Sequence, residues 1–308
     1  MRIISFFPRP IPSTLTEGLK DIDQIQYWQD LSDEDKNNLD DVRIVITNPP
    51  IRMDNELLTR FANLQMVASL GVGYDKFDLE TMKSRGIVLT NTPSATSDDV
   101  ADLAMGLILA LSRRIPQACD HTQKTLRTFS GFPLTHRVSG KRIGIAGLGH
   151  IGLEIARRAE GFKMPIGYTN LTPRDVPYRH FESLKEMAQW CDFLVLAMPG
   201  GAATHHIANR EIFEALGKDG CLINIGRGEL IDTDDLIEAL EQKTIAGAAL
   251  DVFEGEPAID PRLADLDNLL MTPHVGSSTE EARESAGLQC LENIRAFLAT
   301  GTAPNRVI

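Results

Sequence analysis

The sequence predicts an α/β fold with parallel sheets, in a chain long enough for two domains. Short segments rich in aliphatic and β-branched residues alternate with longer amphipathic segments along the whole chain. The later short segments are almost wholly apolar, as parallel strands must be when helices cover both of their faces. The length of 308 residues suggests two domains, since an ordinary domain has about 150 residues. This alternation is typical of strands joined by right-handed helical crossovers.

The expected strands are the short apolar segments of this alternation. They lie at residues 2–7, 42–47, 66–69, 87–90, 142–146, 165–169, 192–197, 221–225 and 245–250. Between them, the clearest helix spans residues 151–162. One face of that helix is apolar and carries Ile151, Ile155, Ala159 and Phe162. The pattern predicts that this helix packs against a sheet.

The last helix is expected to begin with a capping box, in which Ser278 and Glu281 stand three residues apart. Beyond this start, small and apolar residues follow a single stripe. They are Ala282, Ala286, Cys290, Ile294 and Phe297. Such a stripe predicts a helix whose role is packing.

The composition is that of a globular protein with ample material for buried cores. Apolar residues make up 43% of the chain, aromatic residues 6% and charged residues 24%, which argues against a disordered or fibrous chain. The formal net charge is −12. A chain this acidic repels phosphates, so neither a nucleic acid nor an anionic membrane is expected as a partner. The negative net charge does not exclude small anionic ligands, because they respond to the local electric field of a site.

The sequence predicts a cytoplasmic location. The longest apolar run, residues 103–111, has about half the length that a membrane-spanning helix needs. Three prolines among the first twelve residues argue against a signal peptide. The four cysteines have no paired spacing, and we expect reduced, mostly buried thiols. They are Cys119, Cys191, Cys221 and Cys290.

A glycine-rich turn predicts a dinucleotide site. Residues 141–153 read KRIGIAGLGHIGL, so a buried strand runs directly into a turn that opens a helix. In this pattern Gly147 permits the tight turn, Gly149 lets a pyrophosphate approach the backbone, and Gly152 lets helix and strand pack closely. The phosphates are expected on the free amides at the start of the helix, those of His150 and Ile151.

The end of the next expected strand bears on cofactor choice. Sites for NAD usually carry an acidic residue there, which holds the ribose 2′-hydroxyl, but here the strand ends at Asn170. Without a carboxylate nothing repels a 2′-phosphate, and Asn170, Thr172 and Arg174 offer hydrogen bonds to one. We therefore predict a slight preference for NADP(H) over NAD(H). A solvated loop with no cofactor bias is the open alternative.

Three polar residues in the second half of the chain suggest acid–base chemistry on a carboxylate substrate. Arg227 and Glu256 follow expected strands, in NIGRGEL and LDVFEGEP, and His274 follows a short apolar run, in TPHVGSST. Arginine clamps carboxylates, histidine donates protons near neutral pH, and a neighbouring glutamate favours the imidazolium. In a doubly wound sheet, such residues converge at the carboxyl ends of the strands. Taken singly, each also fits an ordinary loop residue.

Six ordered motifs together resemble the D-isomer-specific 2-hydroxyacid dehydrogenase family, in particular its glyoxylate/hydroxypyruvate reductase branch. They are SLGVGYDKFDL, NTPSATSDDVAD, GLGHIG, NIGRGEL, LDVFEGEP and TPHVGSST. The resemblance covers nearly the whole chain. It implies two doubly wound parallel-sheet domains: a flavodoxin-like substrate domain, residues 1–94 and 280–308, and an inserted Rossmann NAD(P)-binding domain, residues 95–279.

The resemblance also implies roles for individual residues. Arg227 matches the arginine that binds the substrate's carboxylate and keto oxygen, His274 matches the proton donor, and Glu256 matches its partner. The backbone amides expected to hold the carboxylate are those of Leu70, Gly71, Val72 and Gly73. The residues expected along the cofactor are Pro199, Thr204, Ile225, Asp251, His274 and Gly276, with Asp251 near the nicotinamide carboxamide.

The expected function is reduction of a short 2-oxo acid, of the glyoxylate or hydroxypyruvate type, by NAD(P)H. By resemblance the product is the D isomer of the 2-hydroxy acid. A cofactor-sensing regulator of the corepressor type, with the same fold, is the alternative from another class. Phosphoglycerate dehydrogenase is a second alternative. A formate dehydrogenase is disfavoured, because those enzymes carry glutamine where this chain has Glu256.

Some features depart from the resemblance or stay open. Leu171 stands where many NADPH-preferring members have arginine. His205, His206 and Glu211 do not have a known metal-ligand spacing, so no metal is expected, and they are interpreted as loop residues near the cofactor. A homodimer is expected from the resemblance. Residues 101–110 fit either a subunit interface or an ordinary core helix.

Overall fold

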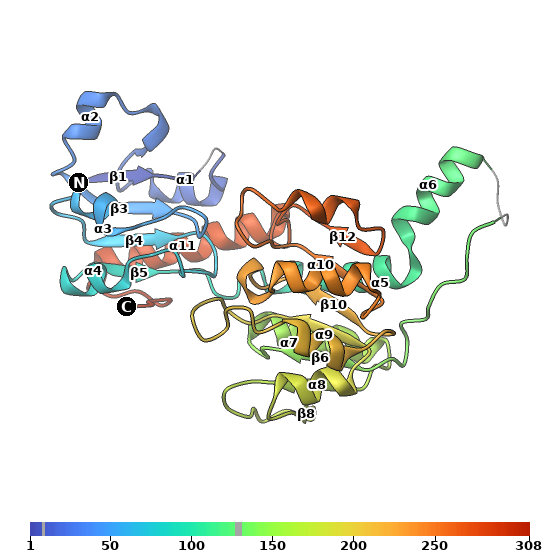
Figure 1. Cartoon of the computed structure of the whole chain (residues 1–308). Helices are drawn as coiled ribbons and strands as arrows, with labels where there is room; N and C mark the ends of the chain where they lie inside the picture. Colours follow the sequence, from blue (N-terminus) through green and yellow to red (C-terminus); the bar gives the residue numbers. More distant parts are fainter. Residues whose placement is uncertain (8–9, 127–130) are drawn as a thin grey trace. The chain divides into compact units, whose positions relative to one another are not determined.

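The computed structural model describes residues 1–7, 10–126 and 131–308, and the chain divides into two compact units (Figure 1). Unit 1 comprises residues 1–96 and 277–308, and unit 2 comprises residues 97–276. The predicted domain boundaries, after residues 94 and 279, lie within three residues of these limits. Each unit is built on one parallel sheet, so the predicted α/β fold with two parallel-sheet domains is confirmed.

Unit 1 is a five-stranded sheet in the order β2-β1-β3-β4-β5. Its strands are β1 (Arg2–Ser5), β2 (Ile25–Tyr27), β3 (Val42–Thr47), β4 (Met66–Ser69) and β5 (Val88–Thr90). Its helices are α1 (Ser13–Leu19), α2 (Asp33–Asn37), α3 (Asn55–Thr59), α4 (Leu79–Ser84) and α11 (Glu280–Thr300). Successive strand residues enter opposite cores: Ile44 packs in the cluster of α1 and α11, and Val45 in that of α3 and α4. The sheet is therefore buried on both faces.

Unit 2 is a seven-stranded sheet in the order β12-β11-β10-β9-β6-β7-β8. Its strands are β6 (Ile143–Ala146), β7 (Ile166–Thr169), β8 (Arg179–His180), β9 (Phe193–Leu196), β10 (Cys221–Asn224), β11 (Gly247–Leu250) and β12 (Leu269–Met271). Its helices are α5 (Ser97–Arg113), α6 (Ile115–Thr125), α7 (His150–Gly161), α8 (Leu184–Trp190), α9 (Arg210–Leu216) and α10 (Thr233–Glu241). The strand order reverses beside β6, which is where sheets of this kind bind ligands beyond the carboxyl ends of their strands.

All nine predicted strands are present, with ends that differ by at most two residues. The strands that were not predicted, β2, β8 and β12, lie at the edges of the two sheets. Edge strands of two or three residues that are partly exposed carry too short a pattern to be recognised in a sequence.

The start of α11 corrects the predicted capping box. The N-cap is Thr279, not Ser278, because the Thr279 side chain accepts a hydrogen bond from the backbone N–H of Ala282 at 2.9 Å. This places Glu280 and Glu281 in the first turn, where acidic side chains favour a helix start. The predicted stripe is confirmed by the burial of Ala282, Ala286, Cys290 and Ile294, with Phe297 partly buried against the same cluster.

The helix α5, which covers residues 101–110, is a core helix of unit 2. Ala101, Ala104, Leu107 and Ile108 are buried in one cluster with α7 and with strands of the same sheet. The core-helix interpretation of this segment is therefore confirmed, and the subunit-interface interpretation stays a prediction.

The cysteines are free thiols, as predicted. Cys191, Cys221 and Cys290 are buried and Cys119 is exposed. Burial raises the pKa of the Cys191 and Cys221 thiols to about 12, which leaves them unreactive. Within the described residues, no helix combines the length and the apolar character needed to cross a membrane.

The close packing of α1 on α11 yields a stability prediction. A Cβ added at Gly287 would lie 2.5 Å from Cβ of Pro12 and 2.8 Å from Oγ1 of Thr14. Overpacking of this kind costs about 1–3 kcal/mol, which exceeds the gain of about 0.5–1 kcal/mol from replacing a helical glycine by alanine. Gly287→Ala is therefore expected to lower the free energy of unfolding.

Gly106→Ala is the matched control, because Gly106 also lies within a helix but has no atom within 4 Å of the added Cβ. It is expected to raise the free energy of unfolding by about 0.5–1 kcal/mol. Urea unfolding followed by circular dichroism measures both variants. Equal or greater stability of the Gly287 variant would show that α1 and α11 are not closely packed.

Candidate active site

The glycine turn between β6 and α7 has the geometry of a dinucleotide site. Gly147 has a φ of 97°, and a Cβ there would lie 2.9 Å from the backbone of Ala197. A Cβ at Gly152 would lie 2.1 Å from the carbonyl oxygen of Gly147, so helix and turn touch directly. A Cβ at Gly149 would meet nothing within 4 Å. This open side of the turn, at the start of a twelve-residue helix, fits a pyrophosphate held by the first amides of His150 and Ile151.

Two of the three residues expected to select the cofactor, Asn170 and Arg174, also hold this turn in place. Asn170 Oδ1 accepts a hydrogen bond from the N–H of Leu148 at 2.7 Å, and Arg174 Nη1 donates to the carbonyl oxygen of Leu148. Arg174 is fixed in turn, because its backbone N–H donates to the Tyr168 hydroxyl at 2.8 Å. Thr172 is exposed. The anchoring of the glycine turn by Asn170 and Arg174 was not predicted.

The loop after β9 contains Pro199 and Thr204. The Thr204 hydroxyl donates to the carbonyl oxygen of Pro199 at 2.9 Å, so it closes the loop on itself. Ile225, directly after β10, is 7% exposed, and its N–H donates a hydrogen bond to the carbonyl oxygen of Leu196 at 3.3 Å. The Thr204 loop follows β9, which pairs with β6, the strand that leads into the glycine turn, and Ile225 follows β10, the next strand beyond β9.

Arg227, Glu256 and His274 follow three neighbouring strands. Arg227 comes after β10, Glu256 lies in the loop after β11, and His274 lies in the turn after β12. Because these strands are parallel and adjacent, their carboxyl ends meet at one edge of the sheet. The fold of unit 2 thus brings to one edge three residues that are far apart in the sequence.

His274 and Glu256 form a fixed pair. His274 Nδ1 lies 2.8 Å from Glu256 Oε2, and the other carboxylate oxygen of Glu256 accepts a hydrogen bond from the N–H of Phe253 at 2.7 Å. The His274 backbone has a φ of 53°, in the left-handed region, and its N–H donates to the carbonyl oxygen of Thr272. Since Nδ1 is used for Glu256, Nε2 is the ring nitrogen that can exchange a proton with a ligand.

The surroundings of His274 favour its protonated form. The hydrogen bond with Glu256 raises the pKa of His274 above its usual value, although partial burial and the positive charge of Arg227 act in the opposite direction. The side chain is 45% exposed. An imidazolium that is accessible and held by a carboxylate is suited to donate a proton at neutral pH.

Buried polar side chains fix the turns that carry these residues. Asp251 is 2% exposed and accepts hydrogen bonds from the Thr272 hydroxyl at 2.6 Å, Val275 N–H at 2.9 Å and Gly276 N–H at 2.8 Å. It therefore holds both sides of the turn that contains His274. The prediction for Asp251 placed it at the cofactor and missed this role. A charged residue at the end of an apolar strand is the signal that could have indicated it.

The loop of unit 1 that was expected to bind a carboxylate has two of its four amides engaged within the unit. Leu70 N–H donates to the Thr47 carbonyl at 2.9 Å, and Gly71 N–H donates to the Thr92 hydroxyl at 2.9 Å. The amides of Leu70 and Gly71 are therefore already used within the unit, and the expectation of carboxylate binding is kept for the amides of Val72 and Gly73.

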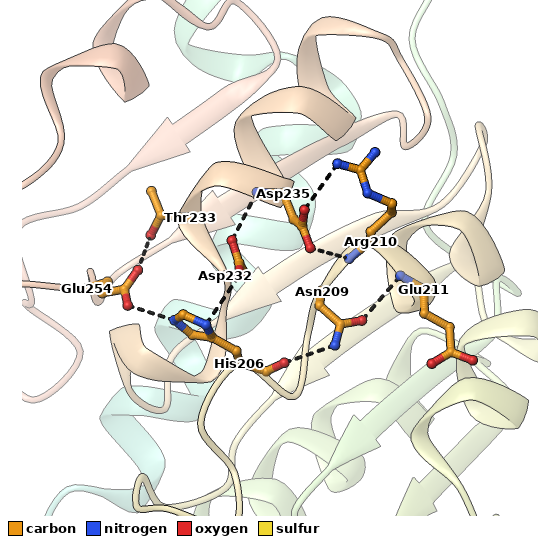
Figure 2. A network of polar contacts seen from close by, with 8 residues as sticks. All are labelled: His206, Asn209, Arg210, Glu211, Asp232, Thr233, Asp235 and Glu254. Carbon is orange, nitrogen blue, oxygen red and sulfur yellow. Dashed lines mark hydrogen bonds and ion pairs between the residues drawn. The ribbon is translucent and has the colours of Figure 1, made fainter.

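His206 lies in a network of charged side chains (Figure 2). Its Nε2 is 2.7 Å from Glu254 Oε1 and its Nδ1 is 3.2 Å from Asp232 Oδ2. The His205 ring stacks on it with centroids 3.8 Å apart. Neither Glu254 nor Asp232 was singled out in the sequence, because nothing in the local pattern shows that they reach His206. Glu211 is paired elsewhere, with Lys185 at 2.7 Å.

Among the residues that the structure describes, His205, His206 and Glu254 are also the group whose side-chain atoms lie close enough to hold a metal ion, within 4.8 Å of one another. However, both ring nitrogens of His206 already face carboxylates. The contact of 2.7 Å between Nε2 and Glu254 takes up the position that an ion would need, so the arrangement fits a hydrogen-bond network better than a metal site.

Comparison with known proteins gives the family. Residues 105–276 match the model of the NAD binding domain of the D-isomer specific 2-hydroxyacid dehydrogenases. The glyoxylate/hydroxypyruvate reductase A HPR2 of Arabidopsis thaliana is 44% identical over 260 residues, which cover 84% of this chain and 83% of that protein. The glyoxylate reductase of Pyrococcus horikoshii is 37% identical over 306 residues, which cover 95% of this chain and 92% of that protein.

Among solved structures, the NADPH-dependent glyoxylate/hydroxypyruvate reductase of Sinorhizobium meliloti, in complex with NADP and malonate, matches with a TM-score of 0.90. It is 35% identical, and the match covers 99% of this chain and 96% of that one. His274 and Glu256 form an imidazole–carboxylate pair beyond the carboxyl ends of the parallel sheet of unit 2. Relatives of known activity match nearly the whole length of this chain. The chain belongs to the D-isomer specific 2-hydroxyacid dehydrogenase family, in its glyoxylate reductase branch.

Proposed function

We propose that this protein reduces a short 2-oxo acid, of the glyoxylate or hydroxypyruvate type, to the D-2-hydroxy acid. The observation that carries the proposal is the contact of 2.8 Å between His274 and Glu256, at the sheet edge where Arg227 also lies. A carboxylate clamp and a proton donor are the two groups that reduction of a 2-oxo acid requires from the protein. NAD(P)H, when bound, supplies the hydride.

Each site residue has one task in this reaction. The Arg227 guanidinium binds the carboxylate and keto oxygen of the substrate, which orients the keto carbon. His274 donates a proton from Nε2 to the oxygen that becomes the hydroxyl. Glu256 keeps the imidazole protonated and in its orientation. The amides of Val72 and Gly73 are proposed as further donors to the carboxylate.

A panel of 2-oxo acids, assayed with both reduced cofactors, tests this function. The relatives include a hydroxyphenylpyruvate reductase of Plectranthus scutellarioides, 42% identical over 277 residues, so the panel should contain an aromatic 2-oxo acid as well as glyoxylate and hydroxypyruvate. Adding 3-phosphohydroxypyruvate tests the phosphoglycerate dehydrogenase alternative. Absence of turnover with the whole panel at millimolar concentration would favour a cofactor-sensing protein.

For the cofactor we propose a preference for NADP(H). Asn170 places an amide, rather than a carboxylate, at the end of β7, and the Sinorhizobium meliloti relative is NADPH-dependent. Asn170→Asp keeps an oxygen to accept the hydrogen bond from Leu148, but adds a negative charge. The ratio of kcat/KM for NADPH to that for NADH is expected to fall by about tenfold, which corresponds to about 1.4 kcal/mol. An unchanged ratio would remove residue 170 from cofactor selection.

The proton-donor role of His274 predicts a selective loss of turnover. His274→Gln removes the only exchangeable ring proton of the proposed mechanism, and general acid catalysis contributes about 10²–10⁴ in rate. We therefore expect kcat to fall by that factor, while the Kd for NADPH, measured by fluorescence titration, changes little. Near-normal kcat would contradict the assigned role.

The partner role of Glu256 predicts a shift of the pH profile. The raised pKa of His274 means that the proton donor is present at low pH and is lost as the pH rises through that pKa. Glu256→Gln still accepts the hydrogen bond from Phe253 but no longer stabilises the imidazolium. The decline of kcat for reduction is therefore expected at lower pH than in the wild type, and an unmoved decline would rule out this partnership.

We also propose a homodimer in the cytoplasm. The helix α6 has no buried residue within this chain, and Ile115 and Leu126 at its two ends are exposed. Covering these apolar side chains with a second copy would remove them from water. Sedimentation velocity gives the mass in solution, and a monomer at micromolar concentration would exclude the dimer.

A further inference from the structure

His206 joins the loops that follow three neighbouring strands. It lies after β9, and its backbone N–H donates to the carbonyl oxygen of Glu229, in the loop after β10, at 2.9 Å. Its side chain reaches Glu254, in the loop after β11, at 2.7 Å (Figure 2). One residue therefore connects the Thr204 loop with the loops that carry Arg227 and Glu256.

Glu254 transmits this connection to the catalytic pair. It stands two residues before Glu256, and its other carboxylate oxygen accepts a hydrogen bond from the Thr233 hydroxyl at 2.7 Å. Burial raises the pKa of Glu254, but the hydrogen bonds from His206 and Thr233 outweigh it, so that the net pKa is lowered. Glu254 thus remains a carboxylate anchored from two sides.

The Arg227 loop packs directly on the same segment. A Cβ at Gly228 would lie 1.8 Å from the carbonyl carbon of Phe253 and 2.2 Å from the nitrogen of Glu254. Phe253 in turn donates its N–H to Glu256 at 2.7 Å. A displacement of Glu254 would therefore move the backbone on which both Arg227 and Glu256 depend.

His206 is itself held at every polar atom. Its carbonyl oxygen accepts a hydrogen bond from Asn209 Nδ2 at 3.1 Å, and Asp232 lies 3.2 Å from Nδ1. Its φ of 51° lies in the left-handed region, which persists in a residue other than glycine only where surrounding contacts determine it. The half-buried ring is thus a rigid link.

We propose that His206 is a positioning residue of the active site: by linking Asp232 to Glu254, it fixes the loop that holds Glu256 and thereby orients the His274 ring. The expected effect on turnover rests on the proposed function, whereas the expected effect on the His274–Glu256 pair does not. The charged groups that act on His274 are Glu256, Asp251 and Arg227.

The test variant is His206→Asn, because asparagine also tolerates the left-handed backbone but is too short to reach Glu254. Misplacing a catalytic group by about 1 Å costs up to about 100-fold in rate, so kcat is expected to fall by about 10- to 100-fold. The decline of kcat with pH is expected to move to lower pH, as in Glu256→Gln. His205→Gln is the matched control, because it changes the exposed neighbouring ring that stacks on His206 and leaves the contact between His206 and Glu254 in place.

A double-mutant cycle separates positioning from simple loss of stability. In the Glu256→Gln background, His206→Asn is expected to have a much smaller effect on kcat and on the pH profile than in the wild type. Additive effects, or an unmoved pH profile together with a lowered free energy of unfolding, would show a merely structural role and overturn the proposal.

Titration of the His274 ring by NMR, assigned with His274→Gln, gives a readout that needs no substrate. We expect the pKa of His274 to be lower in His206→Asn than in the wild type and unchanged in His205→Gln. If the wild type reduces no 2-oxo acid but this shift is present, the proposed function fails and the positioning role stands. If turnover is present and the shift is absent, the positioning role fails alone.

Discussion

Burial of both faces of each sheet is the constraint on which the rest of the structure depends. The central strands of unit 2 are apolar on both sides, as Leu222 and Ile223 of β10 show by entering opposite cores. Polar groups can then gather only where the strands end. Asn224 and Asp251, at the ends of β10 and β11, are buried. The side chain of each makes hydrogen bonds to the backbone of a turn that follows a strand, β10 for Asn224 and β12 for Asp251. Asn224 donates a hydrogen bond to the carbonyl oxygen of Arg227. Asp251 accepts one from the N–H of Val275, in the turn that contains His274.

Much of this arrangement is predictable from the sequence because it depends on local patterns. Apolar runs predict the strands, and glycine spacing predicts the turn before α7. The order of motifs points to Arg227, Glu256 and His274. These features need only the residues within one segment and the rule that parallel strands end at a common edge.

The supporting contacts escape prediction because they join side chains from different loops. Nothing near Glu254 in the sequence shows that His206 and Thr233 reach it, and nothing near Arg174 shows that it binds the backbone of Leu148. The start of α11 shows the limit at the level of one residue, since Ser278 and Thr279 are both good caps and only the backbone geometry decides between them. Asn170 and Arg174 therefore serve the shape of the glycine turn as well as any cofactor selection.

The discontinuity of unit 1 has a consequence for how the chain is made. The helix α11 covers one face of the first sheet with Ala286, Cys290 and Ile294, but the ribosome adds it only after the whole of unit 2. Unit 2 is contiguous and can close its core during translation, whereas the sheet face that carries Ile44 and Met66 is covered by α1 but still lacks α11. While the ribosome synthesises the 180 residues of unit 2, the nascent amino-terminal region therefore exposes the apolar side chains that α11 later covers. During that interval the exposed apolar surface is prone to aggregation, and a chaperone that binds it would protect the nascent chain.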